Sequence, residues 1–227
     1  MGAVADGYHP PVEEYLEAIW ELEEEGAQVI QARLAEHVGH SAPSVSEMVR
    51  RLRREGYVEV RDRVLVLTPT GRTMAESVVR KHRLAERMLV DLIGLPWHKA
   101  HVEACRWEHV ISDEVEERLR ALLENPQTCP HGNPIPGAGA PEIDLHAIAD
   151  LGLGEGLRLE RVTEQVEVDL DALVYLDEHG FVPGAEAVVR AKAPDGTLTL
   201  ELAEGSIALG PALASQLYAS RLAAQPA

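Results

Sequence analysis

Residues with metal-ligating side chains recur at helical spacing near the middle of the chain. Four of them stand at relative positions i, i+4, i+7 and i+8, and this spacing predicts one shared face of a helix over 98–110. These four are His101, Cys105, Glu108 and His109. The preceding predicted helix adds His82 and Glu86, which are also four residues apart. Imidazoles, a thiolate and carboxylates that converge without lysines are costly unless a cation is bound, so the pattern indicates a metal site.

Two other interpretations of these residues stay open at this stage. Taken singly, Glu108 and His109 could be surface residues, and Cys105 could be a small core residue. A catalytic zinc site also has three protein ligands and an open position. However, the sequence contains no HExxH motif, no nucleophile elbow and no phosphate-binding loop. The sequence therefore favours a metal-binding protein that is not an enzyme.

The elements that must position these residues begin with a predicted winged helix-turn-helix. Apolar residues at helical spacing predict helices, and β-branched residues at alternating spacing predict strands. The expected elements are helices over 12–25, 30–38, 42–55, 72–93, 98–110 and 113–123, and strands over 57–60 and 64–67. Pro43 suits the first turn of the third helix, because that position needs no N–H donor.

The second helix of a helix-turn-helix lies in the major groove, so its first turns and the wing supply the candidate DNA contacts. Small hydroxyls and a carboxylate can reach base edges, whereas arginines suit phosphates. The candidates are Ser41, Pro43, Ser44, Ser46, Glu47, Arg50, Arg51, Arg61 and Arg63. A solvated arginine face on a helical hairpin is the alternative, but the order of helix, turn, capped helix and wing favours DNA binding.

The charge of the chain is distributed unevenly. The 227 residues carry a net charge of −17, which argues against a general basic footprint for nucleic acid. Residues 29–63 are nevertheless basic, with seven arginines against five acidic residues, while seven glutamates fall within 13–25. No apolar stretch is long enough to span a membrane and no signal peptide is evident, so we expect a cytoplasmic protein. Cys105 and Cys129 are spaced neither as a zinc knuckle nor as a redox pair.

The sequence changes character after about residue 125. Prolines, glycines and an asparagine make 125–141 an irregular linker. Alternating apolar residues then predict strands, and Asp195-Gly196 predicts a hairpin turn between two of them. We expect a small β-barrel domain over 150–227 with one helix inserted near 169–179.

The order of these parts resembles the diphtheria toxin repressor family of metal-dependent regulators. The most specific stretches are Tyr15–Gly26 (YLEAIWELEEEG), Leu67–Arg87 (LTPTGRTMAESVVRKHRLAER), Glu103–Val115 (EACRWEHVISDEV) and Gly132–Gly137 (GNPIPG). The resemblance implies a mainly α fold with a small β domain. Its three parts would be a winged helix-turn-helix DNA-binding domain (1–71), a helical dimerisation and metal-binding domain (72–141) and an SH3-like, FeoA-like β-barrel (150–227).

The resemblance also implies two metal sites per subunit. The site that triggers DNA binding would use Glu14, Cys105, Glu108 and His109. The ancillary site would use His82, Glu86, His101, Glu164 and Glu167. The protein would then be a homodimeric repressor of metal-homeostasis genes that binds palindromic operators when it is loaded with metal.

The departures from the family pattern bear on the choice of metal. The iron-sensing branch carries Met where this chain has Glu14, and the manganese-sensing branch has a carboxylate there and a further acid that Glu17 could match. Cys105 argues the other way, because thiolate favours softer ions. We expect Mn(II), with Fe(II) as the alternative, and Glu47 in place of the usual glutamine predicts an altered operator. A metal-binding module without operator binding is the less favoured alternative.

Overall fold

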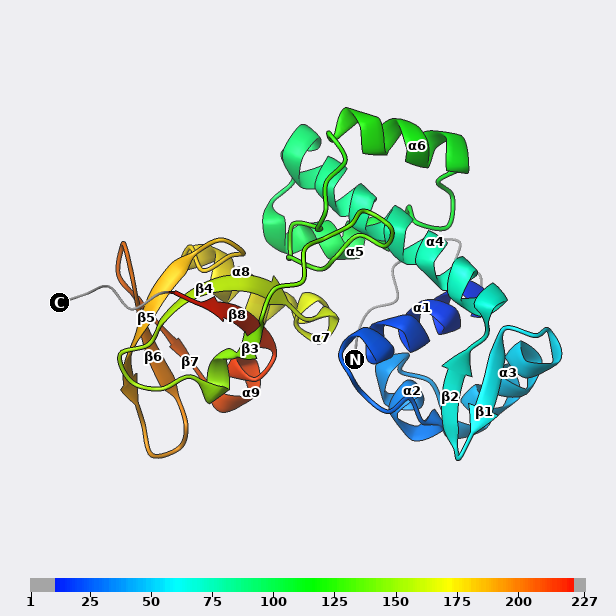
Figure 1. The fold of residues 1–227 in the computed structure, drawn as a ribbon, viewed down its shortest axis with the longest axis horizontal. Helices are drawn as coiled ribbons and strands as arrows, with labels where there is room; N and C mark the ends of the chain where they lie inside the picture. Colours follow the sequence, from blue (N-terminus) through cyan, green and yellow to red (C-terminus); the bar gives the residue numbers. More distant parts are fainter. Residues whose placement is uncertain (1–10, 223–227) are drawn as a thin grey trace. The chain divides into compact units, whose positions relative to one another are not determined.

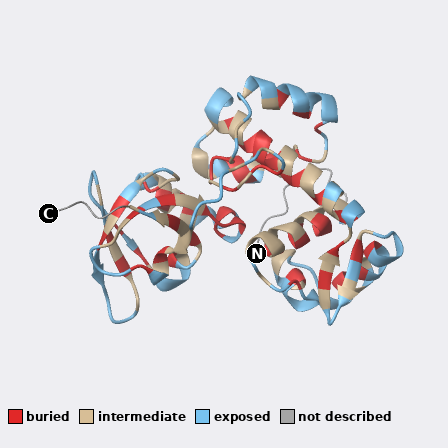
Figure 2. Ribbon diagram, viewed as in Figure 1, coloured by how far each residue is buried: buried red, intermediate tan, exposed pale blue. Residues whose placement is uncertain are grey.

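The computed structural model describes residues 11–222, which divide into two compact units. The first unit comprises residues up to Ala85 together with Val102–Asn125, and the second comprises Glu86–His101 with the residues from Pro126 onward. Each unit is described by itself. Figure 1 shows the course of the chain, and Figure 2 shows that buried residues gather inside each unit.

The first unit opens with the predicted helix-turn-helix. Helix α1 (Pro11–Glu24) is followed by α2 (Gln31–His37) and α3 (Ala42–Arg54). Ser41 caps α3, because its side chain accepts a hydrogen bond from the backbone N–H of Ser44. Apolar residues of the three helices share one core, which includes Tyr15, Leu34 and Val49.

The predicted wing is present as an antiparallel hairpin of β1 (Val58–Arg61) and β2 (Val64–Leu67). The two turn residues, Asp62 and Arg63, both have positive φ, at 47° and 70°. Two successive residues of positive φ make the tight turn that matches the twist of paired strands. The wing therefore holds its arginines in a defined turn (Figure 1).

Helix α4 (Pro69–Arg87) is the long helix that the sequence predicts, and it continues as a π-helical segment, η1 (Met88–Ile93). It begins earlier than expected, because Thr68 Oγ1 accepts a hydrogen bond from the N–H of Gly71 and Pro69 occupies the first turn. Gly94, with φ at 74°, ends the segment.

The single helix predicted over 98–110 is wrong. A short 3₁₀ helix, η2 (Trp97–Lys99), leads into α5 (Ala100–Ala104), and successive turns follow up to Val110. Helix α6 (Asp113–Leu122) then begins at the cap residue Ser112. Cysteine, tryptophan and histidine are weak helix formers, and side-chain contacts of the turn segment prevail over helix propensity.

The second unit contains a six-stranded antiparallel sheet in the order β3-β8-β4-β5-β6-β7. The strands are β3 (His146–Ala147), β4 (Gly156–Val162), β5 (Glu186–Lys192), β6 (Leu198–Leu202), β7 (Ser206–Leu209) and β8 (Leu217–Arg221). The expected inserted helix is α8 (Leu170–Glu178). Three shorter helices accompany it: η3 (Ile148–Asp150), α7 (Glu164–Glu167) and α9 (Pro211–Ala214). Leucine and valine side chains of the strands and α8 form the core of this domain.

The predicted linker is packed directly against β4. An added Cβ at Gly132 would stand 1.9 Å from the carbonyl oxygen of Glu160, so only glycine allows this approach. The carbonyl of His131 accepts a hydrogen bond from Val162 N–H at 2.9 Å. The linker is thereby held in register with the strand. Among the described residues, no helix is both long and apolar enough to cross a membrane.

Candidate metal centres

The first unit contains a group of ligand-type side chains that we term the first cluster. It comprises Glu17, His82, Cys105, Glu108 and His109. Ligand atoms of Glu17, Glu108 and His109 all lie within 4.8 Å of one another. Three separate segments supply these residues: α1, α4 and the turns after α5. A cation bound here would therefore join the first helix of the DNA-binding part to the helices that follow the wing.

Glu108 is the centre of the first cluster. It is only 4% exposed, and its Oε2 lies 2.5 Å from Nδ1 of His82 while its Oε1 lies 3.0 Å from Nε2 of His109. Burial alone would raise the pKa of Glu108, but hydrogen bonds from His109 and His82 outweigh burial and lower the pKa to about 2. Glu108 is thus a carboxylate at neutral pH.

His109 contacts acidic groups through both ring nitrogens. Its Nδ1 lies 2.8 Å from Oε2 of Glu13 on α1, and its Nε2 faces Glu108. Burial lowers the pKa of His109, but the hydrogen bonds and negative charges of Glu108 and Glu13 raise it more, so the net shift is upward. Divalent ions bind neutral imidazole, so metal binding here must displace a proton.

Glu17 has the opposite electrostatic character to Glu108. Burial, followed by the negative charges of Glu108 and Glu21, raises its pKa well above the ordinary value. A negative charge on Glu17 is therefore disfavoured beside Glu108 unless a cation is present. Glu14 lies on the same helix and is not part of the close group of Glu17, Glu108 and His109, so its role as a ligand stays a prediction.

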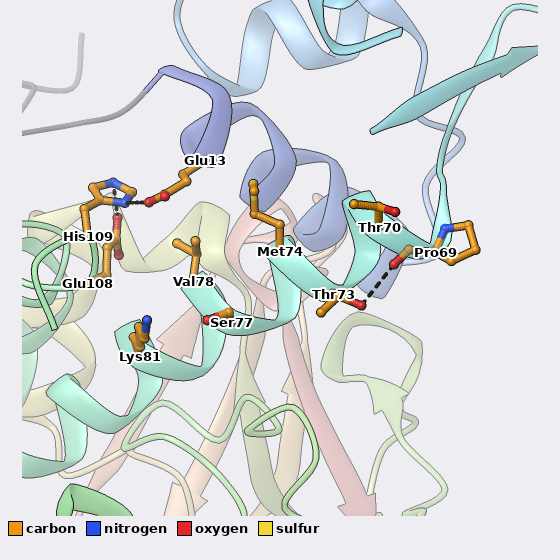
Figure 3. A pocket seen from close by; sticks show the side chains of 10 residues that line it. All are labelled: Glu13, Pro69, Thr70, Thr73, Met74, Ser77, Val78, Lys81, Glu108 and His109. Atoms are coloured by element: carbon orange, nitrogen blue, oxygen red, sulfur yellow. Dashed lines mark hydrogen bonds and ion pairs between the residues drawn. The ribbon is translucent and has the colours of Figure 1, made fainter. Parts of the chain in front are cut away.

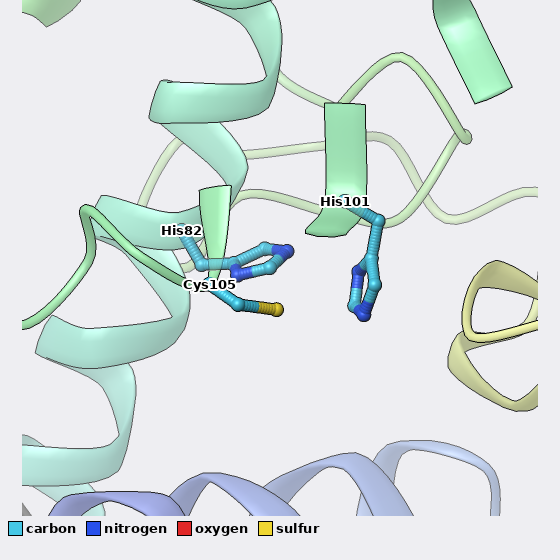
Figure 4. A group of neighbouring side chains, drawn as sticks. All are labelled: His82, His101 and Cys105. Carbon is cyan, nitrogen blue, oxygen red and sulfur yellow. The ribbon is translucent and has the colours of Figure 1, made fainter. Parts of the chain in front are cut away.

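The thiol of Cys105 lies beside the imidazole of His82, with ligand atoms within 4.8 Å (Figure 4). Cys105 is half-buried and reduced. Because α5 ends at Ala104, Cys105 stands in the turn segment and not on the helical face from which the sequence predicted it. The side chains converge through folding of the turn and not through helical periodicity. His101, which Figure 4 also labels, belongs to the second unit.

A pocket of about 620 Å³ opens beside the first cluster, as Figure 3 shows. Glu13, Glu108 and His109 form one end, and the other lining residues lie along α4 from Pro69 to Lys81. The pocket brings solvent up to the edge of the cluster, while the side chain of His109 itself is buried.

The second unit contains a separate group, termed the second cluster. It comprises Glu86, His101, Cys129, His131, Glu164 and Glu167. Each of these residues is buried. The Nδ1 atom of His101 lies 3.1 Å from Oε2 of Glu167 and 3.6 Å from carboxylate oxygens of Glu86 and Glu164. Four of the five residues predicted for the ancillary site thus lie together, and the fifth, His82, belongs to the first unit.

Cys129 and His131 are members that the sequence reasoning missed. The Nδ1 atom of His131 lies 3.1 Å from Oε1 of Glu86 and 3.0 Å from Oε2 of Glu167. Burial lowers the pKa of His131, but the charges of Glu167 and Glu86 raise it well above the ordinary value. Burial, together with the charge of Glu86, raises the pKa of the Cys129 thiol to about 12. The sequence signal that could have revealed them is Cys129-Pro-His131, in which two metal-ligating residue types are separated by one proline and are followed by Gly132.

Both clusters suit divalent metal ions by their chemistry. The first offers carboxylate, imidazole and thiol groups, and the second offers three carboxylates, two imidazoles and a thiol within a buried space. Carboxylates favour hard ions such as Mn²⁺, and nitrogen and sulfur ligands favour Fe²⁺ and later metals. The residues therefore fit a transition-metal ion in each of the two clusters. Because the ligand types are mixed, they do not by themselves select Mn²⁺ over Fe²⁺.

The predicted DNA contacts lie on the solvent side of α3 and the wing. Ser41, Pro43, Ser44 and Glu47 are exposed around the start of α3, and Ser46 is half-buried. The arginines at 50, 51, 61 and 63 are exposed as well. A groove of about 560 Å³ between α3 and β1 is lined by Arg50, Arg53 and Arg54. The first unit thus presents hydroxyl and guanidinium groups to solvent on α3 and the wing.

Comparisons with known proteins agree with this arrangement. Residues 9–64 match the family model described as iron dependent repressor, N-terminal DNA binding domain. Residues 68–137 match the metal binding and dimerisation domain of the same family, and residues 146–221 match the FeoA domain. The predicted fold class is confirmed, including the small SH3-like β domain at the C-terminal end.

Individual relatives give the same result. The chain is 46% identical over 200 residues to the iron-dependent repressor IdeR of Mycobacterium tuberculosis (strain ATCC 25618 / H37Rv), which covers 83% of this chain and 86% of the relative. It is 44% identical over 202 residues to the diphtheria toxin repressor of Corynebacterium diphtheriae, with 83% and 87% covered. A solved manganese-dependent transcriptional repressor in complex with manganese superposes with a TM-score of 0.83 at 31% identity, covering 93% of this chain and all of that one.

These matches settle the class of protein that the sequence predicted. The DNA-binding domain excludes the alternative of a metal-binding module that has no operator, and the family contains repressors and not enzymes. With a DNA-binding domain, a dimerisation domain and metal-ligating residues in place, the chain belongs to the diphtheria toxin repressor family of dimeric, metal-dependent transcriptional repressors.

Proposed function

We propose that this protein represses genes of metal-ion homeostasis by binding palindromic operators as a homodimer when a divalent ion occupies the first cluster. The observation that carries the proposal is the geometry of that cluster, in which α1 meets α4 and the turns after α5. We assign the DNA-binding domain to residues 1–71, the dimerisation and metal-binding domain to 72–141, and the SH3-like domain to 150–227. Such a repressor acts on chromosomal DNA, so we place it in the cytoplasm.

The switch is electrostatic. Without metal, Glu17 and Glu108 face each other at short range, and their like charges oppose close packing of α1 against the turn segment. A divalent ion supplies the positive charge that offsets this repulsion. Glu17, Glu108, His109 and the Cys105 thiol then hold α1 in one position, and Glu14 is the further ligand that we assign from α1.

Fixing α1 also fixes the helices packed on it. Residues of α1, α2 and α3 share one apolar core, so the recognition helix moves with α1. In a homodimer, two recognition helices must match two half-sites about one helical turn apart. A change of a few kcal/mol in favour of the matching arrangement is enough to shift the population of the dimer.

The second cluster is assigned to the ancillary metal site. Its proposed ligands are Glu86, His101, Glu164 and Glu167, with Cys129 and His131 added from the structure. Complete burial and dense ion pairing suit a site that stabilises the fold of the second unit. We therefore assign two metal ions to each subunit, one regulatory and one structural.

The activating ion is proposed to be Mn(II), because carboxylates from α1 contribute to the first cluster. Fe(II) is the second candidate, and a specific observation favours it. The relatives that are 44–49% identical are named iron-dependent repressors or diphtheria toxin repressors, whereas the manganese-dependent structure is 31% identical. The Cys105 thiol is the donor in this chain that suits Fe(II) better than Mn(II).

The DNA contacts are assigned to two groups of residues. Ser41, Ser44, Ser46 and Glu47 would approach base edges from the start of α3, with Pro43 shaping that turn. Arg50, Arg51, Arg61 and Arg63 would contact phosphates.

The experiment that tests the function is a metal titration against a random duplex library. Metal-free protein is incubated with Mn²⁺, Fe²⁺ under anaerobic conditions, or Zn²⁺, at one fixed salt concentration because DNA affinity depends on salt. We expect Mn²⁺ or Fe²⁺ to select a palindromic duplex, and the ion that acts at its cellular concentration identifies the sensor. If no ion promotes binding to any duplex, the proposal fails.

A further inference from the structure

Tyr15 stands between the metal-binding face of α1 and the start of the recognition helix. It follows Glu14 directly and precedes Glu17 by two residues, so it points to a different side of α1. Its side chain is 1% exposed and belongs to the core shared by α1, α2 and α3. The phenol ring is therefore held rigidly by packing, and only its hydroxyl reaches past the core.

The hydroxyl of Tyr15 reaches the turn that begins the recognition helix. Its oxygen lies 2.9 Å from Nδ1 of His40, and the two rings are 5.8 Å apart between centroids. Burial raises the pKa of the Tyr15 phenol, and the Ser44 side chain is close enough to lower it in part. His40 and Ser44 flank Ser41, the residue that caps α3. Tyr15 thus contacts the residue that directly precedes the cap.

A link of this kind is demanding on geometry. A buried hydroxyl without a partner costs more than a hydrogen bond normally contributes, so the Tyr15 hydroxyl and its partner His40 must stay aligned. Tyr15 has few rotatable bonds, and its ring is fixed in the core. A shift or rotation of α1 therefore displaces the turn at His40 or breaks the contact.

We propose that Tyr15 is a positioning residue for DNA recognition, which couples the position of α1 to the N-terminal turn of α3 through His40. The inference rests on the proposed function and deepens it by naming the route from the first cluster to the DNA-reading residues.

The test uses the full-length chain and the substitution Tyr15→Phe, which removes the hydroxyl and keeps the ring in the core. The matched control is Tyr57→Phe, because Tyr57 packs against the same core from outside α1. Three affinities are measured for each protein: that for Mn²⁺ alone, and those of the metal-free and the Mn²⁺-loaded protein for a duplex selected by the wild type. His40→Ala and the double variant complete a double-mutant cycle.

We expect Tyr15→Phe to leave Mn²⁺ affinity within about twofold and to weaken duplex binding by about five- to tenfold, the range typical of one lost hydrogen bond. The double variant should lose less than the product of the two single losses, because the residues act as a pair. A purely structural role for Tyr15 would instead weaken duplex binding of the metal-free and loaded protein by equal factors.

A spectroscopic measurement tests whether metal binding reaches His40 through the Tyr15 hydroxyl or whether Tyr15 only packs in the core. In wild-type protein, the ¹⁵N shifts of the His40 imidazole should change when diamagnetic Zn²⁺ is added, and in Tyr15→Phe they should not. Unchanged duplex binding by Tyr15→Phe, or a parallel loss of Mn²⁺ affinity, would overturn the inference while leaving metal-gated repression intact. Absence of metal-dependent duplex binding in the wild type would overturn both.

Discussion

The two clusters contain similar residue types in very different surroundings. The second cluster is fully buried, and its two histidines lie among the carboxylates of Glu86, Glu164 and Glu167 at 3.0–3.6 Å. The first cluster is only partly buried, adjoins a pocket of about 620 Å³, and includes Glu17, whose pKa is raised by burial and by neighbouring carboxylates.

This difference indicates different roles for the same chemistry. In a closed cluster such as the second, both histidines are ion-paired with buried carboxylates, and these pairs hold the surrounding segments together. In the first cluster, which adjoins a pocket, burial and Glu108 disfavour a negative charge on Glu17, so a bound cation would stabilise that charge and the structure would depend on metal. The comparison assigns regulation to the first cluster and stability to the second, and the following experiments test that assignment.

The largest expected effect is the loss of regulation in Glu108→Gln. Glu108 is the anionic centre of the first cluster, and the neutral amide cannot replace its charge. We expect metal-stimulated duplex binding, measured by fluorescence anisotropy, to fall by about a hundredfold or more, equivalent to about 3 kcal/mol. Glu103→Gln, in the same region of the chain, is the control and should behave as the wild type. Retained activation in Glu108→Gln would contradict the role of the first cluster.

His131→Ala should have the largest effect on stability. Removing the imidazole leaves Glu86 and Glu167 facing each other in a buried space, and loss of one partner of a buried ion pair costs about 3–5 kcal/mol. Chemical denaturation of the metal-free protein measures this change in unfolding free energy. His146→Ala removes a more exposed pair with Asp144 and should change little. If both variants are equally stable, the second cluster does not hold the fold together.

Glu17→Gln should stabilise the metal-free protein and weaken its response to metal. The folded-state pKa of Glu17 is raised above its ordinary value of 4.5, so the folded state loses stability as pH rises from that value through the raised pKa. Removing the titrating group should therefore raise the unfolding temperature at pH 7.5 and have little effect near pH 4.5. Calorimetry at both pH values checks the sign, and a lower unfolding temperature at pH 7.5 would show that Glu17 is favourably paired.

Arg50→Ala should have the smallest effect and should act only on DNA binding. Arg50 is exposed on α3 and lines the groove beside the wing. Loss of one phosphate contact should weaken binding to all duplexes by a similar factor. It should also reduce the slope of log K against log salt concentration by about one. Arg190→Ala, an exposed arginine on β5, is the control. If the salt dependence is unaltered in Arg50→Ala, Arg50 does not contact a phosphate and the DNA binds at another surface.

Sequence periodicity predicted most elements because each is defined by local residues. The helix-turn-helix, wing, α4, α6 and α8 all lie within a few residues of their expected bounds. Periodicity misled over 98–110, where contacts of His109 with Glu13 and Glu108 prevail over weak helix propensity. Of the four residues predicted to share that face, Glu108 and His109 contact each other, and they do so in the turn segment and not on a helix.

Two members of the second cluster were not predicted, because local sequence patterns do not reveal contacts between distant segments. Cys129 and His131 lie in a proline-rich linker, and their spacing matches no known metal motif. They reach Glu86 and Glu167 only because the linker packs on β4 through Gly132. Contacts that depend on how a loop is laid against a sheet leave no periodic signal in the chain.

The central claim is that the ion in the first cluster and the DNA are thermodynamically coupled. The most direct test measures free Mn²⁺ by electron paramagnetic resonance while wild-type protein is titrated with and without a selected duplex. Because coupling is reciprocal, the duplex should tighten one Mn²⁺ site per subunit by the same factor by which Mn²⁺ tightens the duplex. An affinity for Mn²⁺ that the duplex leaves unchanged would contradict metal gating at this cluster.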